Sequence, residues 1–489
     1  MSQSSLRVLH VAAECHPLLK TGGLADVVGA LPHAQRLLGA DARILLPGFP
    51  AIRQGLPDAQ SVAALLPRFG SAGGKLLAST LPDGTPVYVI DVPEAFDRSG
   101  NPYADAAGQP YADNARRFAW LGWVAAQMAQ GELGPWQPAI VHAHDWHAGL
   151  APAYLAHTPI KGKRAAGSVF TIHNLAYQGV FPASEFAALG LPPASFHLEG
   201  LEFYGQISLI KAGLAYCDRI TTVSPSYARE ILHAEHGCGL DGLLRKREAV
   251  LSGILNGVDE TQWDPAHDPC LPAHFDAAHP AGKARCKAAL QESLGLTVDA
   301  DALLFGVVSR LTEQKGLTLV LGGADKLLQQ GGQLVVLGNG EPTLEAGFLA
   351  LAAQYPGRVA LCTGFDEVLS HRIFAGCEVV LIPSRFEPCG LTQMYGMRYG
   401  ALPLVRRTGG LADTVVDCSI ENLADETASG FVFERFEQAD FDAAVRRAYT
   451  LHATPARWRA VRRHAMNLHF GWSGPAGRYL ALYQYLATA

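Results

Sequence analysis

Residues that could bind an anionic ligand occur twice in the chain, in the segments Lys20–Val28 and Arg407–Val415. The two segments are identical at seven of nine positions, both contain Thr-Gly-Gly, and each begins with a cation. Glycine has no side chain, so the backbone can approach a ligand closely, and amides at a helix N-terminus attract anions. The repeat predicts two Gly-Gly loops, each between a strand and a helix, that suit a phosphorylated ligand. Chance similarity between two loop–helix junctions is the alternative.

A second pair of cations, Arg310 and Lys315, follows the apolar run Leu303–Val308. Since they lie five residues apart across a predicted turn, both side chains can converge on one diphosphate, Arg310 as a fork of donors and Lys315 as a point charge. Ligands of open α/β sheets bind beyond the carboxyl ends of the strands. This position therefore favours phosphate binding over the alternative of two solvated surface cations.

A carboxylate, Glu387, lies in the segment Arg385–Gln393, between the apolar run Val379–Ile382 and a helix predicted to begin near Leu391. A carboxylate at such a corner can orient sugar hydroxyls while the neighbouring amides hold a phosphate, and a simple helix cap is the alternative. Cys389 is not expected to be a nucleophile, because the sequence reveals no base or activating site for it.

Histidines mark two further predicted strand ends, in the segments His142–His147 and Thr171–Asn174. Three histidines and an aspartate in six residues could ligate a metal, but the spacing lacks the i, i+4 pair of helical zinc sites. We therefore expect no metal here. Asp145 and His173 are instead expected to line a polar sugar pocket, which the segment Asn256–Asp259 approaches after a further strand.

The elements that must position these residues are predicted from short apolar runs without alternation, which are typical of strands buried on both faces. Helix-compatible stretches lie between many of them, and this alternation implies βαβ units and a parallel sheet. The predicted strands are Val8–Ala13, Ala42–Leu46, Val87–Ile90, Ile140–Ala143, Val169–Ile172, Ile220–Val223, Val250–Leu255, Leu303–Val308, Leu334–Leu337, Val359–Leu361, Val379–Ile382, Leu402–Val405 and Phe431–Phe433. The predicted helices are Asp113–Gln130, Tyr204–Tyr216, Leu317–Gln329, Thr343–Gln354, Ser370–Ala375, Leu391–Tyr399 and Ala476–Ala487.

The domain organisation follows from length, the repeated loop and one proline-rich stretch. A chain of 489 residues alone suggests about three domains. The repeat of the Gly-Gly loop and the stretch Asp259–Pro280, which carries four prolines, instead favour two large α/β domains of doubly wound fold. We expect a first domain over residues 1–260, a second over 261–470 and a final helix over 471–489.

Composition excludes several classes of protein. With 49% hydrophobic and 17% charged residues, the chain is not intrinsically disordered, and a net charge of −6 argues against nucleic-acid binding. The nine scattered cysteines form no CxxC pair, so neither a disulfide scaffold nor a zinc ribbon is expected. No secretory signal and no apolar run of about 18 residues occurs. We expect a cytoplasmic protein without a membrane partner.

Together these motifs resemble those of bacterial glycogen synthase, in glycosyltransferase family 5, which also includes the plant starch synthases. The resemblance covers nearly the whole chain and is carried by Lys20–Pro32, His142–Leu150, Thr171–Asn174, Asn256–Asp259, Ser309–Gly316, Pro383–Gln393 and Arg407–Val415. It implies a GT-B architecture, two doubly wound Rossmann-like domains facing a central cleft, with the acceptor on the first domain, the donor on the second and the final helix crossing back. It also implies transfer of glucose from ADP-glucose to the non-reducing end of an α-1,4-glucan such as glycogen, with retention of configuration and no metal or other cofactor.

The resemblance also implies roles for individual residues. The catalytic group would be Glu387, His173, Arg310, Lys315 and Asp145. Lys20, Gly22 and Gly23 would bind the diphosphate, Arg310 and Lys315 would neutralise the departing phosphates, and Thr408 and Gly409 would cradle phosphate. Glu387 and the amides of Cys389, Gly390 and Leu391 would hold the glucose, while His173 and Asn256 would contact the sugar and Asp145 would lie near the transfer site. Phe365 would stack on adenine, at a position where the family often has Tyr. We expect the amides at Gly22–Gly23, Gly390 and Gly409–Gly410 to be exposed to the nucleotide sugar.

Three alternatives stay open. The same fold could use UDP-glucose, since base preference depends on the pocket around Phe365. An α-glucan phosphorylase would need a pyridoxal phosphate lysine and usually a much longer chain. A noncatalytic glucan- or nucleotide-binding protein is disfavoured because Lys20, Arg310, Lys315 and Glu387 all occur together. Tyr395 stands where many retaining GT-B enzymes carry a second Glu, although family 5 is not expected to have one there. The sequence predicts no oligomeric state.

Overall fold

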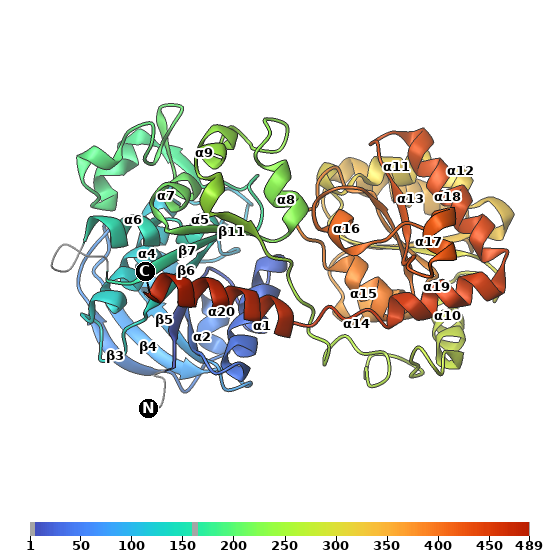
Figure 1. Cartoon of the computed structure of the whole chain (residues 1–489), viewed down its shortest axis with the longest axis horizontal. Helices are drawn as coiled ribbons and strands as arrows, with labels where there is room; N and C mark the ends of the chain where they lie inside the picture. The colour runs from blue at the N-terminus through green and yellow to red at the C-terminus, as the bar shows by residue number, and fades with distance from the viewer. Residues whose placement is uncertain (1–4, 159–164, 489) are drawn as a thin grey trace. The chain divides into compact units, whose positions relative to one another are not determined.

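The chain divides into two compact units in the computed structural model, which describes residues 5–158 and 165–488. The first unit comprises residues 1–257 and 472–489, and the second comprises residues 258–471. Each unit is an α/β structure built around its own sheet (Figure 1). The prediction of two doubly wound α/β units is confirmed.

The described residues of the first unit form a nine-stranded sheet in the order β12-β11-β7-β6-β1-β2-β5-β4-β3. The register from β12 to β5 is parallel, and β4 and β3 are added antiparallel at one edge. The strands are β1 (Arg7–Val11), β2 (Asp41–Pro47), β3 (Gln60–Leu65), β4 (Gly74–Thr80), β5 (Pro86–Asp91), β6 (Ile140–His144), β7 (Gly167–Ile172), β11 (Arg219–Thr222) and β12 (Leu251–Gly253). The expectation of a parallel sheet is therefore right for the centre and wrong for this edge.

The helices of the first unit connect these strands and cover the sheet. They are α1 (Gly23–Leu37), α2 (Pro50–Gln54), α3 (Pro93–Phe96), α4 (Asn114–Gln130), α5 (Asp145–Ala148), α6 (Leu150–His157), α7 (Leu209–Tyr216), α8 (Pro225–Glu230), α9 (Asp241–Lys246) and α20 (Ser473–Thr488). The last of these, α20, lies beside α1 (Figure 1). Its buried Tyr479 and Tyr483 pack in one apolar cluster with Val8, Val27 and Leu31, which fixes the end of the chain on this unit.

One predicted helix of the first unit is wrong in its N-terminal half. The stretch Tyr204–Tyr216 begins in a small antiparallel sheet, in which β10 (Gln206–Ser208) lies between β8 (Val180–Pro182) and β9 (Glu202–Phe203). Tyr204 and Gly205 form the turn, both with positive φ. The helix α7 starts only at Leu209, where the Ser208 hydroxyl accepts a hydrogen bond from the Lys211 N–H as its cap.

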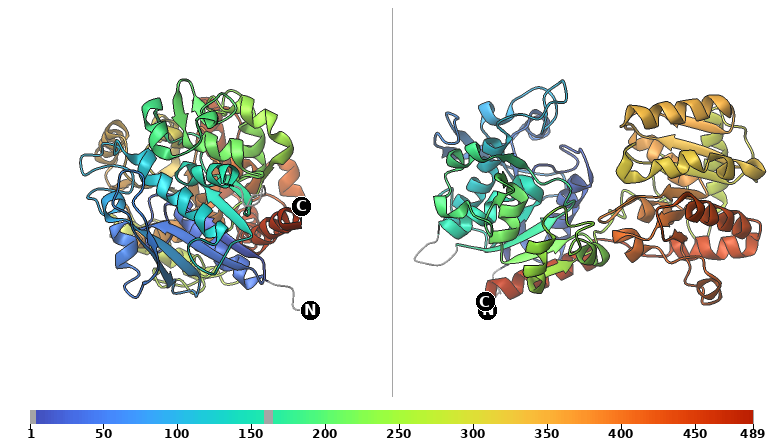
Figure 2. Two further views of the ribbon diagram at one scale, coloured as in Figure 1. Left: turned by 90° about the vertical axis from the view of Figure 1, so that its left-hand side faces the viewer. Right: turned by 90° about the horizontal axis from the view of Figure 1, so that it is seen from above.

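The second unit holds a six-stranded, wholly parallel sheet in the order β15-β14-β13-β16-β17-β18. Figure 2 shows helices on both faces of this sheet. The strands are β13 (Leu304–Val308), β14 (Gln333–Leu337), β15 (Val359–Cys362), β16 (Val379–Ile382), β17 (Leu402–Arg406) and β18 (Phe431–Phe433). The helices are α10 (Ala281–Ser293), α11 (Leu317–Gly322), α12 (Ala324–Leu327), α13 (Pro342–Gln354), α14 (Glu367–Gly376), α15 (Thr392–Arg398), α16 (Gly409–Thr414), α17 (Ile420–Ala424), α18 (Gln438–His452) and α19 (Pro455–Met466).

The predicted helix Leu317–Gln329 is interrupted at two adjacent glycines. α11 ends at Gly322 and α12 begins after Gly323. A Cβ at Gly322 would stand 2.4 Å from the Gln438 side chain, and one at Gly323 would stand 2.8 Å from the Phe441 ring. The break therefore lets α18 pack closely against this connection.

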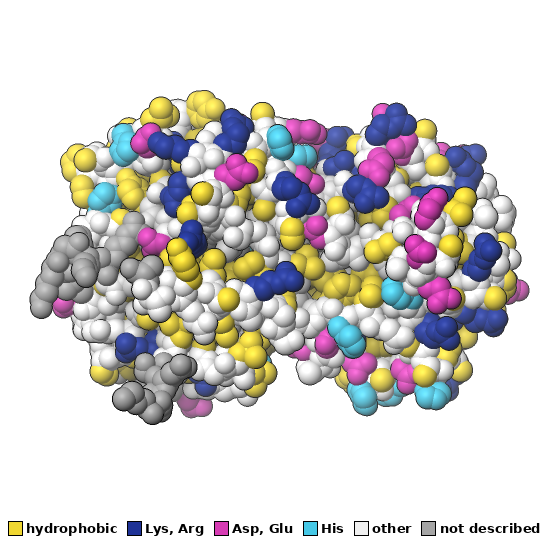
Figure 3. All heavy atoms as spheres, in the orientation of Figure 1, with side chains coloured by type: hydrophobic (Ala, Val, Ile, Leu, Met, Phe, Trp, Pro, Cys, Tyr) yellow, Lys and Arg dark blue, Asp and Glu magenta, His cyan; other side chains and the backbone are white. Residues whose placement is uncertain are grey.

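Charged side chains of both signs are interspersed over the surface that Figure 3 shows. This distribution agrees with the small net charge of −6. None of the described helices is long and apolar enough to cross a membrane.

Candidate active site

In the first unit, the loop between β1 and α1 is organised by a buried carboxylate, Glu14. Its Oε2 accepts a hydrogen bond from the Thr21 N–H at 2.6 Å, and its Oε1 accepts one from the Thr21 hydroxyl at 2.5 Å. The Tyr103 hydroxyl also donates to Glu14. Burial, together with the negative charge of Glu14, raises the pKa of Tyr103 well above its ordinary value, so this phenol stays a donor. These bonds hold the Lys20–Gly23 segment in place.

The predicted anion-binding residues Lys20, Gly22 and Gly23 lie at the start of α1, which begins at Gly23. The Lys20 ammonium is 2.9 Å from the Asp26 carboxylate in the first turn of that helix. Apart from the adjoining chain, no atom of the described residues lies within 4 Å of the position that a Cβ would take at Gly22 or Gly23. The space over both glycines is thus open to a ligand.

Asp145 and His173 lie together at the carboxyl ends of the adjacent strands β6 and β7. Asp145 is buried in a left-handed conformation with a φ of 55°, and its Oδ1 accepts the His173 N–H at 2.7 Å. Burial raises the pKa of the Asp145 carboxyl to about 7, although hydrogen bonds from the backbone of His173 and Asn174 oppose the shift. Burial lowers the pKa of the His173 imidazole to about 3, so this ring is neutral.

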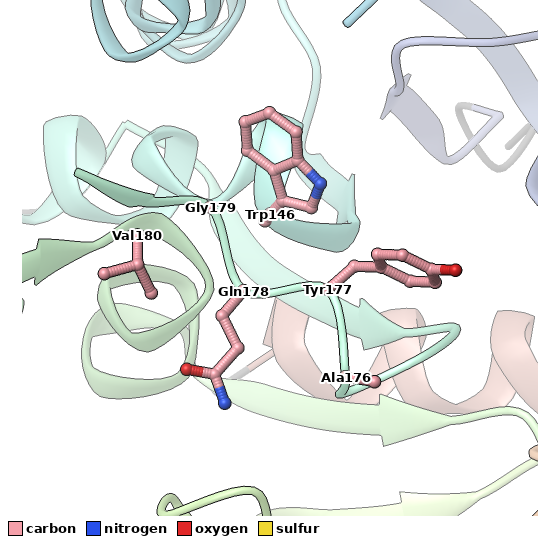
Figure 4. Close-up of a pocket in the computed structure, with 6 residues that line it drawn as sticks. All are labelled: Trp146, Ala176, Tyr177, Gln178, Gly179 and Val180. Carbon is pink, nitrogen blue, oxygen red and sulfur yellow. The ribbon is translucent and has the colours of Figure 1, made fainter. Parts of the chain in front are cut away.

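A pocket of about 410 Å³ lies next to this pair, lined by Trp146 and by residues 176–180 (Figure 4). Trp146 lies directly against Gly179, where a Cβ would stand 2.3 Å from the indole ring. The Gln178 side chain points away from the indole and donates to the Cys238 carbonyl at 2.8 Å. An indole and the half-exposed Tyr177 ring therefore bound this pocket, as suits a carbohydrate.

Asn256 lies after β12, where the chain leaves the first unit. It is buried, and its Oδ1 accepts no hydrogen bond from the described residues. At Gly257 a Cβ would stand 2.8 Å from Trp472, the residue at which the chain returns to this unit. An unsatisfied buried carbonyl oxygen is the kind of group that a ligand hydroxyl can satisfy.

In the second unit, hydrogen bonds join the loop after β13 to the loop after β16. The Arg385 N–H donates to the Gln314 carbonyl at 2.8 Å, and the Gln314 side chain donates to the Phe386 carbonyl at 3.3 Å. At Gly316, with a φ of 66°, a Cβ would stand 2.0 Å from the Pro383 carbonyl oxygen. Only glycine allows this approach.

Lys315 and Glu387 meet because these two loops are joined. The Lys315 ammonium lies 2.6 Å from Glu387 Oε2, and the Ser384 hydroxyl donates to the same oxygen at 2.9 Å. Glu387 therefore does not act as a helix cap, and Leu391 occupies the cap position of α15. A mostly buried carboxylate with one lysine and one hydroxyl can orient a sugar hydroxyl.

Arg310 and Phe365 also follow strands of this sheet and are exposed. Arg310 lies after β13, and Phe365 lies after β15 with 77% of its surface exposed. Both side chains are thus accessible at the carboxyl edge of the sheet, where ligands of such folds bind.

The second Gly-Gly loop differs from the first in its packing. A Cβ at Gly409 would stand 1.9 Å from the Glu387 carbonyl oxygen, and one at Gly410 would stand 2.0 Å from that of Cys389. The Gly410 N–H donates to the Glu387 carbonyl at 3.1 Å. The expectation that the Gly410 amide is exposed to a ligand is therefore wrong, because this loop holds the 387–389 segment in place.

The remaining predicted residues of the second unit surround that contact. Thr408 is buried at the cap position of α16. Gly390 has a φ of 72°, and the buried Gln393 amide donates to the carbonyls of Cys389 at 3.2 Å and Gly390 at 2.8 Å. Cys389 is buried, and Leu391 is partly buried.

Two groups among the described residues bring three possible metal ligands within 4.8 Å of one another. In His10, His142 and His144, the ring nitrogens bond to each other or to neighbouring side chains. In the group of Asp268, Cys270 and His371, Asp268 accepts bonds from His371 at 2.7 Å and from the Tyr399 hydroxyl at 2.6 Å. A metal at either place would have to displace these bonds.

Sequence reasoning missed Glu14, Tyr103 and Ser384. Glu14 follows the predicted strand Val8–Ala13 directly, so the rule that ligands bind at the carboxyl ends of strands could have identified it. Ser384 likewise follows β16 within two residues. Tyr103 lies in the long connection between β5 and α4, which carries no comparable signal.

Comparison with known proteins matches both units of the chain to glycosyltransferases. Residues 7–246 match the family model "Starch synthase catalytic domain", and residues 295–464 match "Glycosyl transferases group 1". The chain is 56% identical over 487 residues to glycogen synthase from Variovorax paradoxus (strain S110), with 98% of each chain covered. It is 55% identical over 484 residues to glycogen synthase from Serratia proteamaculans (strain 568), covering 99% and 100% of the two chains.

Among solved structures, the chain is similar to the catalytic domain of starch synthase IV from Arabidopsis thaliana bound to ADP and acarbose. The TM-score is 0.91 at 33% identity, with 99% of this chain and 100% of that one covered. Two Rossmann-like units, matched along the chain to a glycosyltransferase family model and to a starch synthase structure, define a glycosyltransferase of the GT-B class. Within that class, the chain belongs to the glycogen synthase family.

Proposed function

We propose that this protein elongates an α-1,4-glucan such as glycogen by transferring glucose from ADP-glucose to its non-reducing end, with retention of configuration. The observation that carries the proposal is the contact between Lys315 and Glu387, which joins two strand-end loops in a chain of the glycogen synthase family. The second unit then serves the donor and the first unit serves the acceptor. Starch synthase IV, which binds ADP and acarbose, supports both substrate classes.

The donor site works by placing positive charge where negative charge develops. As the bond between glucose C1 and the phosphate oxygen breaks, the departing ADP gains charge, which Arg310 and Lys315 stabilise. Glu387 accepts hydrogen bonds from glucose hydroxyls, and the amides at Cys389–Leu391 with Thr408 and Gly409 complete the donor site. Phe365 stacks on the adenine ring. Lys20, Gly22 and Gly23 add a further contact with the diphosphate.

The first unit presents mainly uncharged groups to the sugar. His173 is uncharged because burial lowers its pKa to about 3, and it contacts a sugar hydroxyl as a hydrogen-bond partner. Asp145 accepts the His173 N–H and so holds the backbone there, and its raised pKa of about 7 leaves it partly protonated near neutral pH. Asn256 Oδ1 accepts a hydrogen bond from a sugar hydroxyl. The pocket at Trp146 and Tyr177 receives part of the glucan.

Retention follows from attack on the face from which ADP departs. The bond between C1 and the phosphate oxygen breaks through an oxocarbenium-like transition state. The acceptor 4-hydroxyl forms the new bond to C1, and its proton passes to the phosphate oxygen that leaves. No covalent glucosyl–enzyme and no metal or other cofactor enters this sequence.

We also propose that the protein works in the cytoplasm, where glucan synthesis from a nucleotide sugar would take place. The odd number of scattered cysteines supports a reducing compartment.

A donor comparison tests the proposal. Purified protein and glycogen are incubated with ADP-glucose, UDP-glucose or glucose 1-phosphate, and nucleotide or phosphate release is measured with chain extension. We expect extension and ADP release with ADP-glucose. A preference for UDP-glucose would change the donor, and phosphate release from glucose 1-phosphate would indicate a phosphorylase. No turnover with any donor would indicate a binding protein.

A further inference from the structure

A continuous chain of buried polar side chains runs from His173 through the core of the first unit to the C-terminal helix α20. His173 Nε2 lies 3.0 Å from His144 Nδ1, and His144 Nε2 lies 3.0 Å from His10 Nδ1. His10 Nε2 lies 2.8 Å from Gln35 Oε1, and Gln35 Nε2 donates to the Tyr483 hydroxyl at 3.2 Å. His10, Gln35, His144 and Tyr483 are completely buried.

The chain continues beyond Tyr483 to two threonines. The Tyr483 hydroxyl lies 2.6 Å from His142 Nδ1, and His142 Nε2 lies 2.5 Å from the Thr171 hydroxyl. Thr171 in turn lies 2.5 Å from the Thr221 hydroxyl. Four elements of the unit, β1, β6, β7 and β11, are thereby linked to α1 and α20 in one network.

Burial keeps every histidine of the network neutral. It lowers the pKa of His10 to about 4 and that of His173 to about 3, and it lowers the pKa values of His142 and His144 well below the ordinary value. A neutral imidazole carries one N–H donor and one acceptor nitrogen. Each ring in the chain must therefore donate on one side and accept on the other.

The Gln35 amide sets the direction of all these bonds. Its Oε1 can only accept, so His10 must carry its hydrogen on Nε2 and accept at Nδ1. His144 then donates from Nε2 and accepts at Nδ1, and His173 donates from Nε2. On the other side, Gln35 donates to the Tyr483 hydroxyl, which donates to His142. Reversing the amide would reverse every tautomer in the network.

We propose that Gln35 and Tyr483 act as positioning residues for His173. They hold its ring, through the two histidines between, as the tautomer with hydrogen on Nε2 and with Nδ1 as the acceptor. This inference rests on the proposed function in one respect, namely that His173 contacts the sugar. A fixed Nδ1 acceptor selects a sugar hydroxyl that donates, and the helix α20 at the far end of the chain thus takes part in defining the site.

The group of His10, His142 and His144 could also bind a metal, but its geometry favours the hydrogen-bond network. Every ring nitrogen of His10, His142 and His144 already takes part in a hydrogen bond, so a metal would have to displace some of these bonds. A cation among these neutral rings would break the network and leave buried polar groups unpaired, which is costly.

Nitrogen NMR of the protein labelled with ¹⁵N-histidine tests the tautomer directly, with the His173 signal assigned by its loss in His173→Gln. The two ring nitrogens of a neutral histidine have well-separated shifts, so one spectrum reports the tautomer. We expect His173 to be the pure Nε2–H form in the wild type. We expect the two shifts to move toward each other in Gln35→Met and in Tyr483→Phe. Two variants are used so that one still tests the proposal if the other loses its fold, and thermal unfolding monitors the fold of both.

Kinetics with ADP-glucose and glycogen provide the second readout. We expect kcat to fall about 10-fold in both variants, as for one displaced neutral hydrogen bond. Tyr154→Phe is the matched control, because Tyr154 is equally buried in this unit but donates to the Leu189 carbonyl, outside the network. It should keep both the wild-type kcat and the His173 spectrum.

The outcomes separate this inference from the proposed function. An Nδ1–H or mixed His173 in the wild type, or an unchanged His173 spectrum in both variants, would overturn the positioning role. An unchanged kcat in variants with altered His173 shifts would do the same. If the wild type itself transfers no glucose while the spectra behave as expected, the positioning role of Gln35 and Tyr483 is supported and the proposed function is wrong.

Discussion

The ion pair between Lys315 and Glu387 should make the two residues act as one unit in catalysis, which a double-mutant cycle can measure. At the observed 2.6 Å and an effective dielectric constant of about 20, the Coulomb attraction is about 6 kcal/mol. Loss of hydration offsets much of this, since only 19% and 9% of the two side chains are exposed. We therefore expect a coupling energy of about 1–3 kcal/mol between them.

The cycle consists of Lys315→Met, Glu387→Gln and the double variant, each assayed for kcat/KM with ADP-glucose and glycogen. Each single change should lower kcat/KM by about 100- to 1,000-fold, because it removes or misplaces a group that stabilises developing charge. The kcat/KM of the double variant should lie no more than about 10-fold below that of the less active single variant, since the first change already leaves its partner unpaired.

A matched control for the cycle is the exposed pair of Lys246 and Glu199 in the first unit. Lys246→Met and Glu199→Gln should leave kcat/KM unchanged, because an exposed pair contributes little. If the effects of Lys315→Met and Glu387→Gln simply add, the two residues act independently, and the argument from their contact is refuted.

The further predictions concern four single substitutions. Asp145 keeps its proton up to about pH 7 in the folded chain but releases it near pH 4 in the unfolded chain. The free energy of unfolding of the wild type, relative to that of Asp145→Asn, should therefore fall as the pH rises from about 4 to about 7. Urea unfolding at about pH 5 and pH 8 measures this, and a constant difference would contradict it. Gly409→Ala should lower Tm by several degrees, because its Cβ would stand 1.9 Å from the Glu387 carbonyl at a φ of 45°. At Gly22 no atom of the described residues beyond the adjoining chain lies within 4 Å of a Cβ, so Gly22→Ala should keep the wild-type Tm but raise KM for ADP-glucose. Equal losses of Tm in Gly22→Ala and Gly409→Ala would contradict this difference in packing between the two loops. Phe365→Ala should leave Tm unchanged and raise KM for ADP-glucose about 3- to 10-fold, and an unchanged KM would remove the stacking role.

The central strands could be predicted from the sequence because their burial leaves a direct signal. β16 and β18 have the predicted bounds, and both are buried along their whole length. The antiparallel strands β3 and β4 were missed because their residues are mostly exposed or half-buried and so form no continuous apolar run. A strand with one solvated face is recognised mainly by its pairing with another strand, and local composition does not reveal that pairing.

The site could be predicted only as separate motifs. Arg310, Lys315 and Glu387 were identified from their positions after strands, but Lys315 and Glu387 are 72 residues apart in sequence. Their contact depends on Gly316 lying against Pro383, which no spacing rule reports. The two Thr-Gly-Gly segments show the same limit. Gly22 faces open space and Gly409 packs against a carbonyl, although their local sequences are nearly identical.

The product of a single transfer tests the central claim most directly. Maltotriose is incubated with the protein and ADP-glucose, and the new glycosidic linkage is identified by proton NMR while ADP is measured. We expect maltotetraose with a new α-1,4 linkage at the non-reducing end and one ADP released for each glucose transferred. A β linkage, extension at the reducing end, or glucose released without chain growth would contradict retaining transfer from ADP-glucose to a glucan.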